Sequence, residues 1–114
     1  MTKKWIIGIV FALLLVLTAC NKSSEPGKYD AFAQCLTAND VVMYGTEWCS
    51  HCQNQKKMLG NSFQYIDYVD CDRNEQQCYS AGIRGYPTWN IKGENYPGEK
   101  NLFELSQLSG CDIS

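Results

Sequence analysis

The chain has 114 residues, of which seven are cysteine, and a formal charge of −2. This length allows one small domain, and because residues 20–114 hold eight Lys and Arg against twelve Asp and Glu, no basic nucleic-acid-binding surface is expected. A domain of this size buries a modest core, so seven cysteines indicate disulfide bonds made in an oxidising compartment, with one cysteine left over.

The first residues have the pattern of a secretory signal. Two lysines precede an apolar run over residues 5–19, which at fifteen residues is shorter than the roughly 20 that a spanning helix needs. Leu17-Thr18-Ala19-Cys20 resembles the lipobox of bacterial lipoproteins. That resemblance implies that residues 1–19 are removed and that Cys20 is lipidated. The alternative is an uncleaved anchor helix with an incidental cysteine; both place the domain outside the cytoplasm, tied to the cell membrane.

Residues 20–28 are polar and rich in chain breakers, which predicts a flexible tether before a domain over residues 29–114. Apolar periodicity, strand-forming runs and turn residues then predict an α/β domain with a central mixed four-stranded sheet flanked by helices. The expected elements are helix 29–38, strand 41–44, helix 49–59, strand 63–69, helix 75–81, strand 88–91, a turn at 92–95 leading into a strand at Tyr96, and a helix from Leu102 that stops at Gly110.

The motif Trp48-Cys49-Ser50-His51-Cys52 lies where the first predicted strand passes into the second helix. Free N–H groups and the dipole at a helix N-terminus stabilise a thiolate, so Cys49 is the expected nucleophile. Cys52 lies on the same helical face and is the expected resolving thiol, able to form a disulfide with Cys49. An imidazolium at His51 would stabilise the thiolate further, which favours a disulfide donor.

Three other uses of this cysteine pair are less well supported. A plain structural disulfide would close too small a loop to be an effective staple. A metal site would need more ligands, and the chain has one histidine and no second closely spaced Cys-x-x-Cys, so no metal is expected. Covalent haem attachment needs a histidine directly after the second cysteine, and Gln53 occupies that place.

A second motif, Gly85-Tyr86-Pro87-Thr88, comes directly before a predicted strand. Proline is tolerated at the first residue of a strand. A cis Tyr86–Pro87 bond would turn the chain sharply and leave backbone groups free to pair with a peptide, whereas base rates alone favour an ordinary trans turn. Trp48, Tyr86 and Ser50 are expected to receive substrate peptides beside Cys49, while Tyr44 and Trp89 are expected in the core.

Together the two motifs, about 35 residues apart, resemble the thioredoxin fold over residues 29–112. The resemblance implies a thioredoxin-like α/β domain in which Cys49 and Cys52 are the redox pair and Pro87 is a cis-proline, with no cofactor beyond that redox-active disulfide. A monomer is expected.

A narrower resemblance is to the thioredoxin-like domain that accompanies vitamin K epoxide reductase homologues. In that family the domain passes oxidising equivalents from a quinone-linked membrane enzyme to secreted protein thiols. Here Ser50 stands where the family usually has proline, and Met43 stands where thioredoxins and protein disulfide isomerases carry a buried acid. The stretches that carry this narrower resemblance are Met43-Tyr44-Gly45, Trp48 to Gln53, Tyr68 to Cys71, Gly85 to Trp89 and Leu105 to Gly110.

The other four cysteines allow three pairings. Cys71 ends the second predicted strand and Cys78 lies in the next helix, so a local bridge between them is natural. In the thioredoxin-like layout, the ends of the helices near Cys35 and Cys111 lie at the same pole. Cys71–Cys78 and Cys35–Cys111 are therefore the expected disulfides; the competing idea is that Cys71 and Cys78 form a second redox relay.

These features predict a lipid-anchored, extracytoplasmic thiol–disulfide oxidoreductase of a bacterial cell membrane. Its expected role is to oxidise thiols of secreted or envelope proteins and to be recycled by a vitamin K epoxide reductase-like membrane oxidase. The alternatives are a reductase or isomerase, for instance in cytochrome c maturation, and a non-enzymatic binding lipoprotein held by disulfides. A copper or zinc carrier is a more distant alternative.

Overall fold

The computed structural model describes residues 25–114. The expected signal peptide over residues 1–19 and the expected lipidation site Cys20 lie outside the described residues. Within residues 25–114, every helix is too short or too polar to cross a bilayer.

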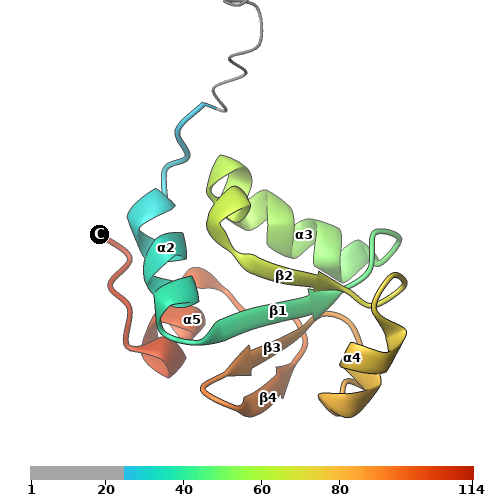
Figure 1. Ribbon diagram of the computed structural model, residues 1–114. Coiled ribbons are helices and arrows are strands. Elements are labelled where there is room, and N and C mark those ends of the chain that lie inside the picture. The colour runs from blue at the N-terminus through green and yellow to red at the C-terminus, as the bar shows by residue number, and fades with distance from the viewer. Residues whose placement is uncertain (1–24) are drawn as a thin grey trace, which may run out of the picture.

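A four-stranded sheet with the strand order β2-β1-β3-β4 forms the centre of the domain (Figure 1). Strand β1 pairs in parallel with β2 and antiparallel with β3, which in turn pairs antiparallel with β4. The predicted fold class, a thioredoxin-like mixed sheet flanked by helices, is therefore confirmed. The elements in chain order are α2 (Asp30–Ala38), β1 (Val41–Gly45), α3 (Ser50–Leu59), the 3-10 helix η1 (Gly60–Tyr65), β2 (Asp67–Asp70), α4 (Glu75–Ser80), β3 (Thr88–Ile91), β4 (Glu94–Pro97) and α5 (Leu102–Ser109).

The two faces of the sheet bury different hydrophobic clusters, because successive side chains of a strand point to opposite faces. On one face, Met43 of β1 and Trp89 of β3 are fully buried under residues of α2, α3 and α5. On the other face, Tyr44 packs with the Cys71–Cys78 region next to α4. Tyr44 and Trp89 are thus core residues, as expected.

One predicted strand begins four residues too early. Residues 63–65 belong to η1, whose end is closed by a hydrogen bond from the Ile66 N–H to the Phe63 carbonyl oxygen at 3.0 Å. The Phe63 ring packs edge-on against Tyr68 with the ring centroids 5.5 Å apart. Phe63 and Tyr65, whose residue types favour a strand, therefore belong to the 3-10 helix, and β2 starts only at Asp67.

The domain makes its first contacts at Gly27, within the expected tether. The Gly27 N–H donates to the Asp30 carboxylate at 3.1 Å, and the Tyr29 N–H donates to the Ser62 hydroxyl at 2.8 Å. A Cβ on Gly27 would lie 2.3 Å from the Ser62 backbone nitrogen, so only glycine allows this approach. The C-terminal part of the expected tether thus contacts the domain at Gly27.

Both expected disulfides are present in the structure. Cys35–Cys111 ties α2 to the segment that follows α5, across a sequence separation of 76 residues. Cys71–Cys78 closes the connection between β2 and α4 across a separation of 7. Cys49 and Cys52 are left as free thiols.

Candidate active site

Cys49 lies between the end of β1 and the start of α3, where it is the N-cap residue of the helix. Its backbone is extended, with φ −71° and ψ 119°, and its sulfur accepts a hydrogen bond from the Cys52 N–H at 3.2 Å. The sulfur therefore occupies the position that a capping oxygen takes in many helices. Lys56 and Lys57 in the last turn of α3 complement the other end of the helix dipole.

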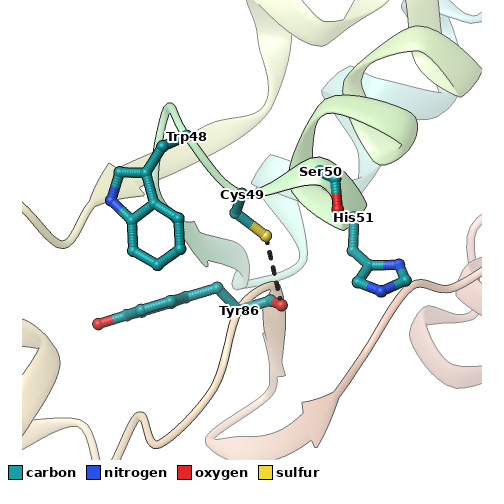
Figure 2. A pocket seen from close by; sticks show the side chains of 5 residues that line it. All are labelled: Trp48, Cys49, Ser50, His51 and Tyr86. Atoms are coloured by element: carbon teal, nitrogen blue, oxygen red, sulfur yellow. Dashed lines mark hydrogen bonds between the residues drawn. The ribbon is translucent and has the colours of Figure 1, made fainter.

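The two sequence motifs meet at the Cys49 sulfur. The Tyr86–Pro87 bond is cis, as the resemblance implies, and Pro87 is fully buried. The Cys49 thiol donates to the Tyr86 carbonyl oxygen at 3.4 Å, the contact drawn as a dashed line in Figure 2. The fold thus brings the expected redox pair and the expected cis-proline to one place.

Cys49 and Cys52 occupy different environments. The Cys49 side chain lines a surface pocket, whereas Cys52 is fully buried. Burial raises the pKa of the Cys52 thiol to about 12, and its hydrogen bond with Cys49 adds to this effect. At neutral pH Cys52 is therefore a protonated thiol behind Cys49, which is itself 7% exposed where it lines the pocket.

The pocket at Cys49 has a volume of about 440 Å³ and aromatic walls. Trp48 is 68% exposed, but its indole N–H donates to the Asp72 carboxylate at 2.8 Å, and its ring packs edge-on against Tyr86. Figure 2 shows both rings on one side of the Cys49 sulfur and His51 on the other. All five lining residues, Trp48, Cys49, Ser50, His51 and Tyr86, were singled out in the sequence.

His51 contacts a carboxylate that the sequence does not single out. Its ring points away from the Cys49 sulfur (Figure 2), and its Nδ1 lies 2.6 Å from Glu99 Oε1. This contact lowers the pKa of Glu99, helped by a second hydrogen bond from the Asn54 amide. The prediction that an imidazolium at His51 stabilises the Cys49 thiolate therefore stays a prediction, and the direct contact of the ring is with the Glu99 carboxylate.

A buried amide below the site connects three segments. The Gln55 side-chain oxygen accepts from the Trp89 indole N–H at 3.0 Å and from the Lys100 backbone N–H at 2.8 Å. Its amide nitrogen donates to the Lys100 carbonyl oxygen at 2.8 Å. Gln55 thereby holds α3 against β3 and against the segment that carries Glu99, so the position of the His51 partner depends on it.

Met43 is fully buried in the core and brings no acid to the site. The nearby Glu47 is a surface residue and pairs with Lys56 at 3.2 Å. Within residues 25–114, no group of three or more His, Cys, Asp or Glu side chains is arranged to hold a metal ion.

Comparisons with known proteins agree with this geometry. The thioredoxin family model matches residues 23–107. The thiol-disulfide oxidoreductase LTO1 of Arabidopsis thaliana is 35% identical over 105 residues, which cover 84% of this chain and 28% of the plant protein. A probable protein disulfide-isomerase, ER-60 of Schistosoma mansoni, is 29% identical over 86% of this chain and 22% of its own length.

Solved thioredoxins are also similar to the chain. An N21Q mutant thioredoxin from Halobacterium salinarum has a TM-score of 0.42 at 23% identity, covering 68% of this chain and 76% of its own. The chain spans about a quarter of the length of these curated relatives: 28% of the plant protein and 22% of the Schistosoma protein.

Proposed function

The chain belongs to the thioredoxin family, and from this premise we propose that it is a thiol–disulfide oxidoreductase acting on protein thiols. The observation that carries the proposal is the Cys49 sulfur at the N-cap of α3, facing the Tyr86 carbonyl oxygen, with buried Cys52 one turn behind it. An accessible nucleophile backed by a buried resolving thiol is the arrangement that disulfide exchange requires.

Disulfide donation takes two exchange steps at these sulfurs. A substrate thiolate attacks the Cys49 sulfur of the Cys49–Cys52 disulfide; the bond between the cysteines breaks, and Cys52 leaves with the electron pair. A second substrate thiolate then attacks the substrate sulfur of the mixed disulfide and expels Cys49. The substrate loses two electrons and the cysteine pair gains them. Reduction of a substrate is the same path reversed.

We further propose that the protein works as an oxidant outside the cytoplasm, anchored by lipid on Cys20. The support is the signal-like start of the chain, the two disulfides that the domain holds besides the redox pair, and the replacement of a buried acid by Met43. A quinone-linked membrane oxidase of the vitamin K epoxide reductase type would take the two electrons back from the reduced pair. Trp48, Tyr86 and Ser50 would receive the substrate chain in the pocket.

Trapping tests the exchange chemistry. A Cys52→Ala variant keeps the attacking thiol but has no resolving thiol, so we expect it to accumulate mixed disulfides with protein substrates that disappear on reduction. Cys49→Ala is the matched control and should accumulate none through Cys52, because that thiol is buried. A non-enzymatic binding protein would form none in either variant, and that result would refute the proposal.

The reduction potential of the Cys49–Cys52 pair tests the direction. We expect a value well above that of thioredoxin, toward the range of about −180 to −120 mV found for disulfide donors. A value near the roughly −270 mV of thioredoxin would contradict the oxidant role and favour the reductase alternative.

A further inference from the structure

The Tyr68 hydroxyl is buried beside the redox pair without a hydrogen-bond partner in the described part of the chain. Tyr68 lies on β2, next to Met43 of β1 in the parallel register. Buried polar atoms are almost always hydrogen-bonded, so a hydroxyl without a partner among the described protein groups is free to donate to a nearby acceptor.

The Tyr68 hydroxyl and the Cys52 sulfur both lie close to Gly45. A Cβ built on Gly45 would lie 2.9 Å from Cys52 Sγ and 3.5 Å from Tyr68 Oη. Both atoms therefore lie close to this glycine, on the side where another residue would carry its Cβ.

The charges around the hydroxyl keep it a donor. Burial raises the pKa of Tyr68, and the neighbouring carboxylates of Glu47 and Asp70 raise it further, followed by Cys52 and Cys49. Lys56 is the cation at this place; its Nζ lies 4.3 Å from the centre of the Tyr68 ring and 3.2 Å from Glu47. The phenol thus keeps its proton and can donate a hydrogen bond without ionising.

We propose that the Tyr68 hydroxyl donates a hydrogen bond to the Cys52 sulfur whenever exchange places negative charge on that sulfur. When a substrate thiolate opens the Cys49–Cys52 disulfide, the electron pair of the broken bond stays on Cys52, which then takes a proton from water. In the reverse step, the Cys52 thiol gives its proton to water, and its thiolate attacks the Cys49 sulfur of the mixed disulfide, breaks the bond between Cys49 and the substrate, and expels the substrate thiolate. Tyr68 stays protonated throughout. This inference rests on the proposed function.

A hydrogen bond from Tyr68 would supply stabilisation of the Cys52 thiolate, which the rest of the site provides only weakly. Cys52 receives a backbone hydrogen bond from Thr46, but its surroundings disfavour the thiolate overall, and Met43 provides no acid or base. A hydrogen bond to a charged atom is the stronger kind, and it acts here only while the charge exists. Tyr68 would therefore lower the barrier to exchange and leave the resting forms unchanged.

The test is the rate at which Cys52 releases glutathione from a mixed disulfide on Cys49. Tyr68→Phe removes only the hydroxyl, and Tyr44→Phe is the matched control because Tyr44 packs on the opposite face of the sheet. We expect Tyr68→Phe to slow release about tenfold at pH 7 and Tyr44→Phe to leave it within about twofold. The pH at which release accelerates should move up by about one unit in Tyr68→Phe alone.

The equilibrium constant with glutathione at pH 7 separates this role from packing. We expect it to be unchanged in Tyr68→Phe, since neither the disulfide nor the dithiol form carries charge on Cys52. Equal release rates in Tyr68→Phe and the wild type would overturn the inference, as would a shifted equilibrium constant. If the wild type itself releases no glutathione through Cys52, the proposed function fails instead.

If Tyr68→Phe does not fold, NMR of a Cys49→Ala protein with ¹³C at the tyrosine Cζ atoms tests whether Tyr68 responds to charge on Cys52. Titration through the Cys52 ionisation should move the Tyr68 resonance, and that part of the response should vanish when Cys52 is also replaced by alanine. A Tyr68 resonance that responds equally with and without Cys52 would overturn the inference.

Discussion

Two cysteines one helical turn apart differ in their surroundings because Cys49 caps helix α3 and Cys52 is buried within the first turn of that helix. Cys49 sits at the pocket with its sulfur between the Cys52 N–H and the Tyr86 carbonyl oxygen. Cys52 is fully enclosed, and burial raises its pKa to about 12. The order of reaction, with Cys49 first and Cys52 second, follows from this difference in surroundings.

Alkylation of the reduced pair should follow the same order. We expect iodoacetamide to modify Cys49 well before Cys52 at pH 8, as read by mass spectrometry. In a Cys49→Ala protein, Cys52 modification should keep accelerating as pH rises toward about 12, because the raised pKa keeps the thiol protonated below that value. Equal rates at the two cysteines in the wild type would contradict the assignment of roles.

The contact between His51 and Glu99 places a carboxylate at the edge of the pocket. Glu99→Gln removes that charge, so a thiolate at Cys49 should be better stabilised and the pair should become more oxidising. We expect the reduction potential to rise by about 10–30 mV. Glu25→Gln is the control, since it makes the same change in net charge at an exposed residue. An equal shift in both variants would show a bulk charge effect only.

The helices and strands that the sequence predicts correctly are those marked by a pattern within a few neighbouring residues. Strand β1 and helix α3 follow from a short apolar run and a cysteine motif at their junction, and both lie where the sequence predicts them. The 3-10 helix was missed because Phe63 and Tyr65 read equally well as strand residues. Gln55, Asp72 and Glu99 were missed because their partners lie many residues away and nothing in an ordinary polar side chain indicates a distant partner.

Gln55 gives a test of how α3 is held in place. Gln55→Leu leaves the Trp89 indole N–H and the Lys100 backbone groups without partners. We expect the free energy of unfolding to fall by about 2–4 kcal/mol, measured by urea denaturation. Gln53→Leu is the control on the exposed face of the same helix and should cost less than about 1 kcal/mol. Similar losses in the two variants would show that the buried amide does not hold the helix.

The whole molecule is a small domain in which two disulfides reinforce two separate hydrophobic clusters. Cys111 belongs to the larger cluster beneath α2, α3 and α5, and Cys71 and Cys78 belong to the smaller one. The loops they close differ tenfold in length, with separations of 76 and 7 residues. A longer closed loop restricts the unfolded chain more, so the two bonds should stabilise the domain unequally.

Removing each disulfide should show this inequality. We expect Cys35→Ala with Cys111→Ala to lower the free energy of unfolding by about 4 kcal/mol, and Cys71→Ala with Cys78→Ala by about 2.5 kcal/mol. Exchange activity should persist in both folded double variants. Loss of exchange in a well-folded Cys71→Ala, Cys78→Ala protein would instead identify that pair as a redox relay.

Transfer of two electrons from a reduced substrate to the oxidised protein tests the central claim most directly. The oxidised protein is mixed with an equimolar amount of a reduced protein dithiol, quenched with acid and alkylated, and the modified cysteines are identified by mass spectrometry. The account predicts that Cys49 and Cys52 become alkylated, one pair for each substrate disulfide formed, while Cys35, Cys71, Cys78 and Cys111 stay unmodified. If the substrate stays reduced and Cys49 and Cys52 stay oxidised, the protein is not a disulfide donor.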